Sequence, residues 1–343
     1  MIEQRSAPRV VLFGLGGTIA MAPVEGGGIA PALSPAQLLA AVPGLAESGI
    51  AVDVVDFRRL PGASLGFADV HALSVAVDAA LADGADGVVV AQGTDTVEET
   101  AYLLDLWHRG PRPVVVTGAM RNPTVAGHDG PANLLAAIRA AASPEVRDLG
   151  VVVVLADEIH AARRVRKTHS TSVGAFTSPN GGPLGHLVAG RPCVLNQPRG
   201  RFVVPRPAGP PGARVCVVTA TLGDRGELLH GVEDRLDGLV VAGMGVGHVP
   251  EALVARLHEI GGRIPVVLAS RTGAGPVLTD TYAFPGSERD LLARGLVPAG
   301  FVDPVRARLL LCAALAAGAD RDTLAAAFSS AGGYTAPGTW PWP

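Results

Sequence analysis

Short runs of Val, Ile and Leu alternate with longer segments rich in Ala and Leu along the first half of this 343-residue chain. Continuous β-branched runs are typical of buried strands in a parallel sheet, and the longer Ala- and Leu-rich segments are typical of helices. This alternation predicts an α/β domain with a doubly wound, parallel-rich sheet. The expected strands are Val10–Phe13, Val52–Phe57, Gly87–Ala91, Pro113–Thr117 and Val151–Leu155, and the expected helices are Pro35–Ala41, Ala68–Ala82, Glu98–His108 and Pro131–Ala142.

A proline-rich segment interrupts this pattern. Residues 196–213 contain five prolines and three arginines, a composition typical of a linker between domains. We therefore expect an N-terminal domain of residues 1–195, a linker of residues 196–213 and a smaller C-terminal α/β domain of residues 214–343. In the last of these the pattern predicts strands at Arg214–Thr219, Gly238–Ala242 and Pro265–Ala269 and helices near Pro250–Ile260, Ser287–Arg294 and Asp303–Ala317.

The composition narrows the class of protein. Hydrophobic residues make up 48% of the chain and charged residues 17%, which predicts a packed soluble protein. A net charge of −3 gives no electrostatic reason to expect nucleic acid or an anionic membrane as a partner. Apolar runs such as Leu309–Ala317 are shorter than the ~20 residues that cross a bilayer. The start of the chain does not resemble a signal peptide, and three widely spaced cysteines offer no disulfide or zinc framework, so we expect a cytoplasmic protein.

Lysine is almost absent from the chain. Of the 28 Lys and Arg residues, Lys167 is the single lysine. An arginine stays protonated in proteins, whereas a lysine can lose its proton and act as a base. A lone lysine thus indicates a position where a proton is transferred, although codon bias with one remaining lysine explains the count equally well.

Two of the predicted strands end in a glycine turn that is followed directly by a threonine. The first ends in Gly16-Gly17-Thr18, and the second in Gln92-Gly93-Thr94-Asp95-Thr96. In open α/β sheets the ligand crevice lies outside the carboxyl ends of the strands. We therefore expect Thr18, Thr94 and Asp95 to meet in one cleft, together with Lys167.

This set of side chains suits acyl transfer. A threonine hydroxyl is a weak nucleophile until a neighbouring base takes its proton, and a neutral Lys167 could be that base, with Asp95 as the group that orients it. Glycine before each threonine lets backbone N–H groups approach a developing oxyanion.

Two other interpretations account for parts of the pattern. The Gly14–Gly17 turn could bind phosphate, but it lacks both the P-loop spacing and the third glycine of the dinucleotide motif. The segment Thr94-Asp95-Thr96 could cap a helix that begins near Glu98. Capping and catalysis are compatible, because a helix N-terminus stabilises negative charge.

Several segments together resemble the bacterial-type L-asparaginase/glutaminase family over essentially the whole chain. The resemblance implies an N-terminal doubly wound domain joined to a smaller α/β domain, in agreement with the pattern above. The segments are Gly16–Ala20, Gln92–Thr100, Thr117–Arg121, Lys167-Thr168, Asp129–Leu134, Gly182–Gly185 and Pro304–Leu309.

The resemblance also implies roles for individual residues. Thr18 matches the acylated nucleophile of the family, and Thr94, Asp95 and Lys167 match its second triad. Ala119 matches the residue whose carbonyl receives the leaving amide. Gly17 and Gly93 accompany the two threonines in the substrate site. The family further implies a homotetramer built from intimate dimers.

The chain departs from the family pattern around the substrate. The family usually has a tyrosine in the loop after the first threonine, and the loop Met21–Pro31 has none. At the position of the pair that binds the α-carboxylate and α-amine, the chain offers Ala63 and Ser64, of which only Ser64 has a hydroxyl. The asparagine contributed by the partner subunit corresponds to His248, for which a solvated loop histidine is the alternative. The nearest counterpart of the partner's glutamate is Glu288.

The expected function is therefore hydrolysis of the side-chain amide of L-asparagine, or of a close analogue, to aspartate and ammonia. The resemblance implies neither a metal nor an organic cofactor, and a small-molecule amide as the partner. Two alternatives stay open. The chain could be an amidase for a larger or modified asparagine-like amide, or a catalytically silent homologue that binds a ligand.

Overall fold

The computed structural model describes residues 7–23, 29–31 and 33–343 and forms two compact units. The first unit ends at Pro198 and the second begins at Arg199. The proline-rich segment 196–213 contains neither helix nor strand.

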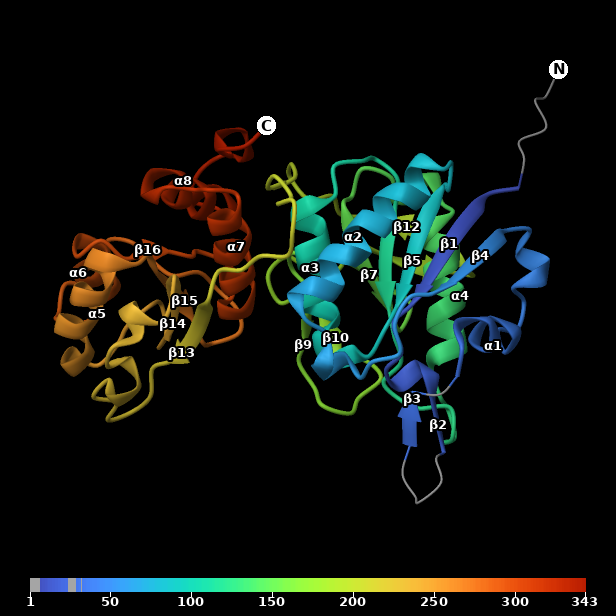
Figure 1. Cartoon of the computed structure of the whole chain (residues 1–343), viewed down its shortest axis with the longest axis horizontal. Coiled ribbons are helices and arrows are strands. Elements are labelled where there is room, and N and C mark those ends of the chain that lie inside the picture. Colours follow the sequence, from blue (N-terminus) through green and yellow to red (C-terminus); the bar gives the residue numbers. More distant parts are fainter. Residues whose placement is uncertain (1–6, 24–28, 32) are drawn as a thin grey trace. The chain divides into compact units, whose positions relative to one another are not determined.

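The first unit is built on an eight-stranded sheet with the strand order β12-β11-β8-β7-β6-β5-β1-β4 (Figure 1). The five strands from β7 to β4 in this order are parallel, and the other three continue the sheet in antiparallel orientation. The parallel strands are β1 (Arg9–Gly14), β4 (Ala51–Asp56), β5 (Gly87–Ala91), β6 (Val114–Thr117) and β7 (Val151–Leu155), and the antiparallel strands are β8 (Glu158–Ala161), β11 (Gly185–Val188) and β12 (Arg191–Val194).

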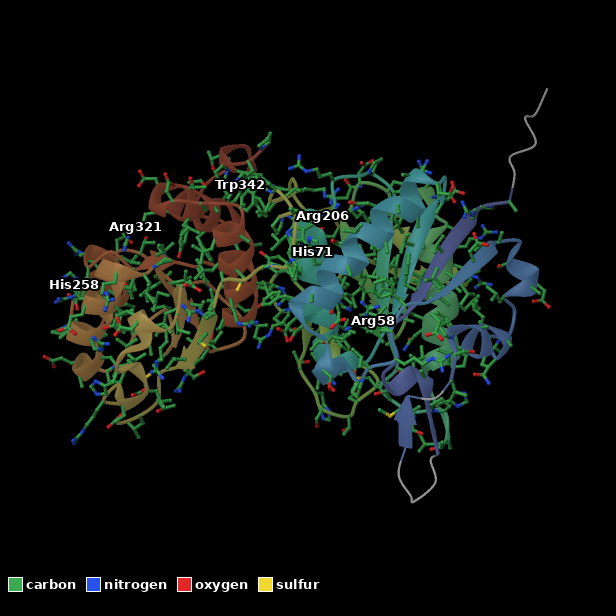
Figure 2. All side chains as sticks on the ribbon, in the orientation of Figure 1. Arg58, His71, Arg206, His258, Arg321 and Trp342 are labelled. Atoms are coloured by element: carbon green, nitrogen blue, oxygen red, sulfur yellow. The ribbon has the colours of Figure 1, made fainter. Side chains whose placement is uncertain are left out.

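Helices cover both faces of this sheet. Alternate strand residues such as Val10, Leu12 and Val89 pack against α4 (Gly130–Ala141), with Leu38 of α1 (Pro35–Ala40) at the edge of the same cluster. The helices α2 (Phe67–Ala82) and α3 (Val97–Trp107) lie on the other face (Figure 1). His71 of α2 meets Trp107 of α3 edge to face, with ring centroids 5.9 Å apart (Figure 2). The predicted doubly wound, parallel-rich fold is confirmed.

The second unit contains a four-stranded parallel sheet with the order β13-β14-β15-β16. Trp342 at the chain end packs against Trp340, whose indole N–H donates to the carbonyl of Val203 at 2.8 Å (Figure 2). The strands are β13 (Val215–Thr219), β14 (Gly238–Gly243), β15 (Val266–Ser270) and β16 (Val297–Pro298), and the helices are α5 (Glu251–Arg263), α6 (Glu288–Ala293), α7 (Pro304–Ala316) and α8 (Arg321–Ala331).

All the strands and helices expected from the sequence are present in both units, with boundaries shifted by no more than three residues. Among the elements that the pattern did not predict are the antiparallel strands β8, β11 and β12, the short strand β16 and the last helix α8. Within the described parts of the chain, no helix is long and apolar enough to cross a membrane. The three cysteines are free thiols.

Candidate active site

The first threonine turn follows β1 and depends on two glycines with left-handed backbone. Gly16 has φ 93° and Gly17 has φ 83°, values that residues with a Cβ rarely adopt. A Cβ on Gly17 would lie 2.1 Å from the Cα and the nitrogen of Gly93, so only glycine fits at this position. Thr18 then opens a single 3₁₀ turn that ends at Ala20.

The second threonine turn follows β5 and lies against the first. Because β1 and β5 are parallel neighbours, with Gly14 opposite Ala91, their carboxyl ends meet at one edge of the sheet. A Cβ on Gly93 would lie 3.1 Å from the Cα of Gly17 and 2.8 Å from the nitrogen of Gly62. The backbone of Gly93 thus touches those of Gly17 and Gly62, which places the turns of Thr18 and Thr94 side by side as the sequence predicted.

The segment Thr94-Asp95-Thr96 precedes a helix, as the capping interpretation expected, and Thr96 occupies the N-cap position of α3. The Thr96 side chain makes no cap hydrogen bond, so it caps the helix by position only. The Thr96 hydroxyl instead donates to the carbonyl of Gly62 at 2.8 Å and accepts a hydrogen bond from the Gln92 amide at 3.2 Å. The segment therefore joins the second turn to the loop at Gly62.

Lys167 reaches the second turn from a two-stranded hairpin. Its strand β9 (Arg166–Lys167) pairs with β10 (Phe176–Thr177), and Lys167 stands opposite Phe176. The Lys167 Nζ donates to Thr94 Oγ1 at 3.0 Å and to Asp95 Oδ1 at 3.1 Å. The Lys167 side chain is 18% exposed, Thr94 is buried, and the Asp95 side chain is 63% exposed. The structure thus brings together the predicted base, its orienting carboxylate and one hydroxyl.

Two contacts hold the hairpin in place. The backbone N–H of Lys167 donates to Glu98 Oε2 at 3.2 Å, so that the helix after the Thr94 turn also carries the lysine strand. At the other strand, His160 Nδ1 lies 3.0 Å from the hydroxyl of Ser178, the residue that follows β10. Neither Glu98 nor His160 was singled out for this role from the sequence, because both contacts join segments that are distant along the chain.

His160 is buried as a neutral imidazole. Burial, with a smaller contribution from His186, lowers the pKa of His160 to about 4. The carboxylate of Glu158 lies 3.1 Å from His160 Nε2, but its side chain is 38% exposed. Solvent screens this carboxylate, so burial decides the protonation state of the ring.

The Thr18 hydroxyl has no hydrogen-bond partner among the residues that the structure describes. Its neighbours Ile19 and Ala20 are buried and form a small cluster with Ala119. Thr18 itself is partly exposed at the carboxyl edge of the sheet. The geometry leaves this hydroxyl available for a substrate.

Ala119 lies in a loop that is fixed by hydrogen bonds to its backbone. Asp129 accepts hydrogen bonds from the N–H of Met120 at 3.0 Å and of Arg121 at 2.8 Å, and Asn133 donates to the carbonyl of Gly118 at 3.0 Å. A Cβ on Gly118 would lie 3.1 Å from Thr94 Cγ2, so this loop touches the second threonine. The sequence motif contained Asp129 and Asn133, but their support of the loop emerges only from the structure.

The loop with Ala63 and Ser64 also borders the second turn. It forms one 3₁₀ turn, Gly62–Ser64, in contact with Gly93. The side chains of Ala63 and Ser64 are exposed, so this edge of the site is open. The loop Met21–Pro31 forms the hairpin strands β2 (Met21–Pro23) and β3 (Ile29–Pro31), and its residues 24–28 lie outside the described residues.

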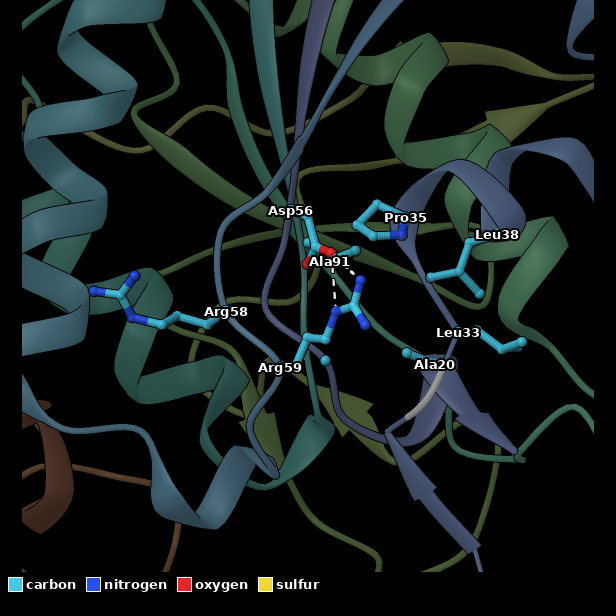
Figure 3. A pocket seen from close by; sticks show the side chains of 10 residues that line it. Ala20, Leu33, Pro35, Leu38, Asp56, Arg58, Arg59 and Ala91 are labelled. Atoms are coloured by element: carbon cyan, nitrogen blue, oxygen red, sulfur yellow. Dashed lines mark hydrogen bonds and ion pairs between the residues drawn. The ribbon is translucent and has the colours of Figure 1, made fainter. Parts of the chain in front are cut away.

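A small pocket lies beside the first turn, lined by Gly14, Gly16 and Asp56 among others (Figure 3). Its volume of about 10 Å³ holds at most a single water. Arg59 forms an ion pair with Asp56, and Arg58 pairs with Asp69 of α2 at 2.9 Å. The positive charges near the turn are therefore already engaged with carboxylates.

In the second unit, His248 and Glu288 form a pair. His248 Nε2 lies 3.2 Å from Glu288 Oε2, and Oε1 accepts the N–H of Thr281 at 2.9 Å and of Tyr282 at 2.8 Å. Burial alone would raise the pKa of Glu288, but the backbone N–H groups and His248 together hold it below its ordinary value. Glu288 is fully buried, and His248 packs edge to face against the half-exposed rings of Tyr282 and Phe284.

No group of three or more His, Cys, Asp or Glu side chains in the described portions of the chain is arranged to hold a metal ion. The chemistry that the first unit presents is that of hydroxyls, an amine, a carboxylate and backbone groups.

Comparison with known proteins places this arrangement in a family. Residues 9–199 match the model "Asparaginase, N-terminal", and residues 214–328 match the model "Glutaminase/Asparaginase C-terminal domain". A probable L-asparaginase of Deinococcus radiodurans is 38% identical over 330 residues, which cover 94% of this chain and 98% of that protein. A probable periplasmic L-asparaginase of Haemophilus influenzae is 35% identical over 236 residues, 67% of this chain and 66% of that one.

A solved structure leads to the same class. The probable cytoplasmic L-asparaginase of Campylobacter jejuni superposes with a TM-score of 0.83 at 31% identity, covering 94% of this chain and 99% of the other. The fold and the matches define a hydrolase that acts on amides. This chain belongs to the L-asparaginase family.

Proposed function

We propose that this protein hydrolyses the side-chain amide of L-asparagine, or of a close analogue, through an acyl-enzyme on Thr18. The observation that carries the proposal is the contact of Lys167 Nζ with both Thr94 Oγ1 and Asp95 Oδ1, beside a turn that presents a second hydroxyl without a partner among the described residues. The names of the relatives support the choice of substrate.

The first half-reaction forms an ester. Thr18 Oγ attacks the amide carbon, a C–O bond forms, and the oxyanion is stabilised by backbone N–H groups of the two glycine turns. The C–N bond then breaks, the hydroxyl proton reaches the leaving nitrogen, and ammonia departs. The carbonyl of Ala119, held by Asp129 and Asn133, accepts a hydrogen bond from the leaving amide.

The second half-reaction returns the free enzyme. Water attacks the ester carbon, while the Thr94 hydroxyl and the Lys167 amine remove its proton and Asp95 orients the amine. The ester C–O bond breaks, the proton returns to Thr18 Oγ, and aspartate leaves. One amide and one water thus give one acid and one ammonia.

The proposal is tested by ammonia release from L-asparagine, L-glutamine and substituted amides, and by mass spectrometry of the intact chain after rapid acid quench. We expect ammonia from asparagine and an acyl adduct that maps to Thr18. Thr18→Val should abolish both signals while circular dichroism stays unchanged. Folded protein that releases no ammonia from any of these amides would refute the proposal.

A second candidate substrate is a larger or N-modified asparagine. The exposed side chains of Ala63 and Ser64 and the lack of tyrosine in Met21–Pro31 favour it, because the edge of the site that would grip the α-amino acid is open. The ratio of kcat/KM for N-acetyl-asparagine to that for asparagine decides between the two. A ratio above one selects the larger amide.

We also propose a homotetramer of intimate dimers in which His248 contributes to a neighbouring site. Its support is the half-exposed aromatic surface of Tyr282 and Phe284 around His248, since exposed rings of this kind are enriched at interfaces. Sedimentation should give four chains at working concentration, and Phe284→Asp should yield smaller species with lower activity. A monomer active at the full rate excludes the shared site. We further propose that the enzyme acts in the cytoplasm, as described for the Campylobacter neighbour.

A further inference from the structure

A pocket whose lining includes neither Thr18 nor Thr94 lies in the first unit between α1 and α4. Its walls come from Ile19, Leu38 and Leu134, and its rim carries Arg121 and His128. The pocket has about 60 Å³ of space, several times the ~10–15 Å³ that one water requires. It is therefore large enough for a short aliphatic chain, in contrast to the pocket beside Asp56.

We propose that this pocket binds a small aliphatic carboxylate and that binding there supports the Thr18 turn from behind. The second half of this proposal rests on the proposed function, whereas the first half concerns binding alone.

The charge at the rim selects an anionic head group. Arg121 Nη1 donates only to the carbonyl of Gly127, at 3.2 Å, and no described carboxylate pairs with this guanidinium. The nearest acid along the chain, Asp129, already accepts hydrogen bonds from the backbone N–H of Met120 and Arg121 and from Asn133. Arg58 and Arg59 near the first turn are paired with carboxylates, whereas Arg121 at this pocket is not paired with a described one and is open to an anionic ligand.

The interior of the pocket selects an apolar tail. Ile19 and Leu134 are buried, and Leu38 packs against the same cluster as Ile19. A carboxylate without a chain would leave these walls uncovered, whereas methylene groups packed against them bury apolar surface and strengthen binding. The combination of an arginine at the mouth and aliphatic walls therefore fits a short fatty acid better than a free inorganic anion.

The pocket is linked to the proposed nucleophile in two ways, through the residue next to Thr18 in the chain and through side-chain packing. Ile19 follows Thr18, and a Cβ on Gly130 would lie 3.1 Å from Ile19 Cγ1 and 3.5 Å from Ala119 Cβ, so the start of α4 packs against both residues. Ile19 and Ala119 also line the pocket. A ligand in it would therefore contact both the Thr18 turn, through Ile19, and the Ala119 loop. It can shift their conformations only as far as it binds one arrangement better than another.

The binding half is tested with hexanoate on the full chain, by ligand-observed NMR and by thermal shift, with 1-hexanol and acetate as probes that lack the charge or the tail. We expect saturable binding of hexanoate and at least tenfold weaker binding of both controls. Arg121→Gln should weaken hexanoate about tenfold or more, because a charge-assisted contact is lost. Arg109→Gln, an exposed arginine elsewhere in the unit, is the matched control and should bind as the wild type does.

A second pair of variants fills the pocket without touching the proposed catalytic groups. Ala41 lines the pocket and its neighbour Ala40 does not, and both are exposed. Ala41→Phe should abolish hexanoate binding, and Ala40→Phe should leave it intact. Hexanoate that binds both phenylalanine variants equally, or that fails to bind the wild type, overturns the site.

The coupling half is read in two ways. Saturating hexanoate should change kcat for asparagine at least twofold in the wild type and not in Ala41→Phe. It should also change the Kd for aspartate, and by linkage aspartate should change the Kd for hexanoate by the same factor. Hexanoate binding without either effect overturns the coupling and leaves the site standing. Absence of ammonia release with every amide counts against the proposed function, while the NMR result still decides the pocket.

Discussion

Replacement of Lys167 by arginine separates proton transfer from electrostatic support. Arginine keeps the positive charge and can still pair with Asp95, but it does not give up its proton near neutral pH. In the structure the lysine amine bridges Thr94 and Asp95 at 3.0 and 3.1 Å, and the Asp95 end of this bridge is largely exposed. The longer side chain can therefore extend toward solvent without displacing buried atoms.

The two roles predict different magnitudes. Loss of a general base costs roughly 10²–10⁴ in rate, or about 3–5 kcal/mol of barrier. Loss of a partly exposed ion pair costs less than about 1 kcal/mol of stability. We therefore expect kcat for asparagine to fall at least 100-fold in Lys167→Arg, while the urea midpoint stays near that of the wild type.

The assay compares steady-state ammonia release with a single turnover. If Lys167 acts mainly in ester hydrolysis, the variant should still show a first burst of ammonia and should accumulate the acyl adduct on Thr18. Lys167→Ala supplies a further control, because added primary amines should restore part of the rate in proportion to their basicity. A Lys167→Arg variant that retains more than about a tenth of the wild-type rate, a difference of only ~1.4 kcal/mol, refutes the base role.

Three other substitutions test the structural elements that surround this site, namely the first glycine turn, the Ala119 loop and the buried His160. Gly17→Ala places a Cβ 2.1 Å from Gly93 on left-handed backbone, and we expect the free energy of unfolding to fall by about 3 kcal/mol or more and activity to be lost. Gly49 is also left-handed but has open space around it, so Gly49→Ala is the control and should cost no more than about 2 kcal/mol. Asp129→Asn replaces one of the two carboxylate oxygens that accept three N–H groups with an NH2 donor, so at least one of these hydrogen bonds is lost. We expect kcat to fall more than KM rises, and unchanged kcat would count against the support of the Ala119 loop. The pKa of His160 is about 4 in the folded protein and 6.5 when exposed, so the unfolded chain takes up the proton first as pH falls. The free energy of unfolding should therefore drop by about 3 kcal/mol between pH 6.5 and 4 and level off below. Urea titrations at pH 7 and 4.5 should show a drop that His160→Gln lacks, and equal drops in both proteins would exclude His160 as its source.

The sequence predicted the parallel strands well because their signal is local. Runs such as Val88–Val90 are buried on both faces, and the hydrophobic pattern alone reports that. The strands β8, β11 and β12 carry mixed polar and apolar residues at the antiparallel side of the sheet, so no continuous hydrophobic run predicts them.

In the candidate site, too, features set by local sequence could be predicted better than contacts between distant residues. The two Gly-Thr turns at neighbouring strand ends could be predicted from local pattern and sheet topology. The contact of Lys167 with Thr94 joins residues 73 positions apart. The lone lysine indicated a base in the same cleft, and the family resemblance assigned it to Thr94 and Asp95. Thr96 takes the N-cap position of α3 without a side-chain cap, and its hydroxyl donates to the carbonyl of Gly62, 34 residues away, a contact that the local pattern could not predict.

The contacts of Gly93 with Gly17 and with Gly62 have a consequence for how such an enzyme can change. Three loops from separate parts of the chain meet at Gly93 without side chains between them, so a side chain on Gly17 or Gly62 would displace Gly93, and one on Gly93 would displace both. The distance between the Thr18 and Thr94 hydroxyls is therefore set by both turns together, and a substitution that moves one turn also moves the other. Diversity in substrate choice is confined to positions whose side chains face open space, such as Ala63 and Ser64. Directed evolution aimed at new amides should find its productive variants there and return the three glycines unchanged.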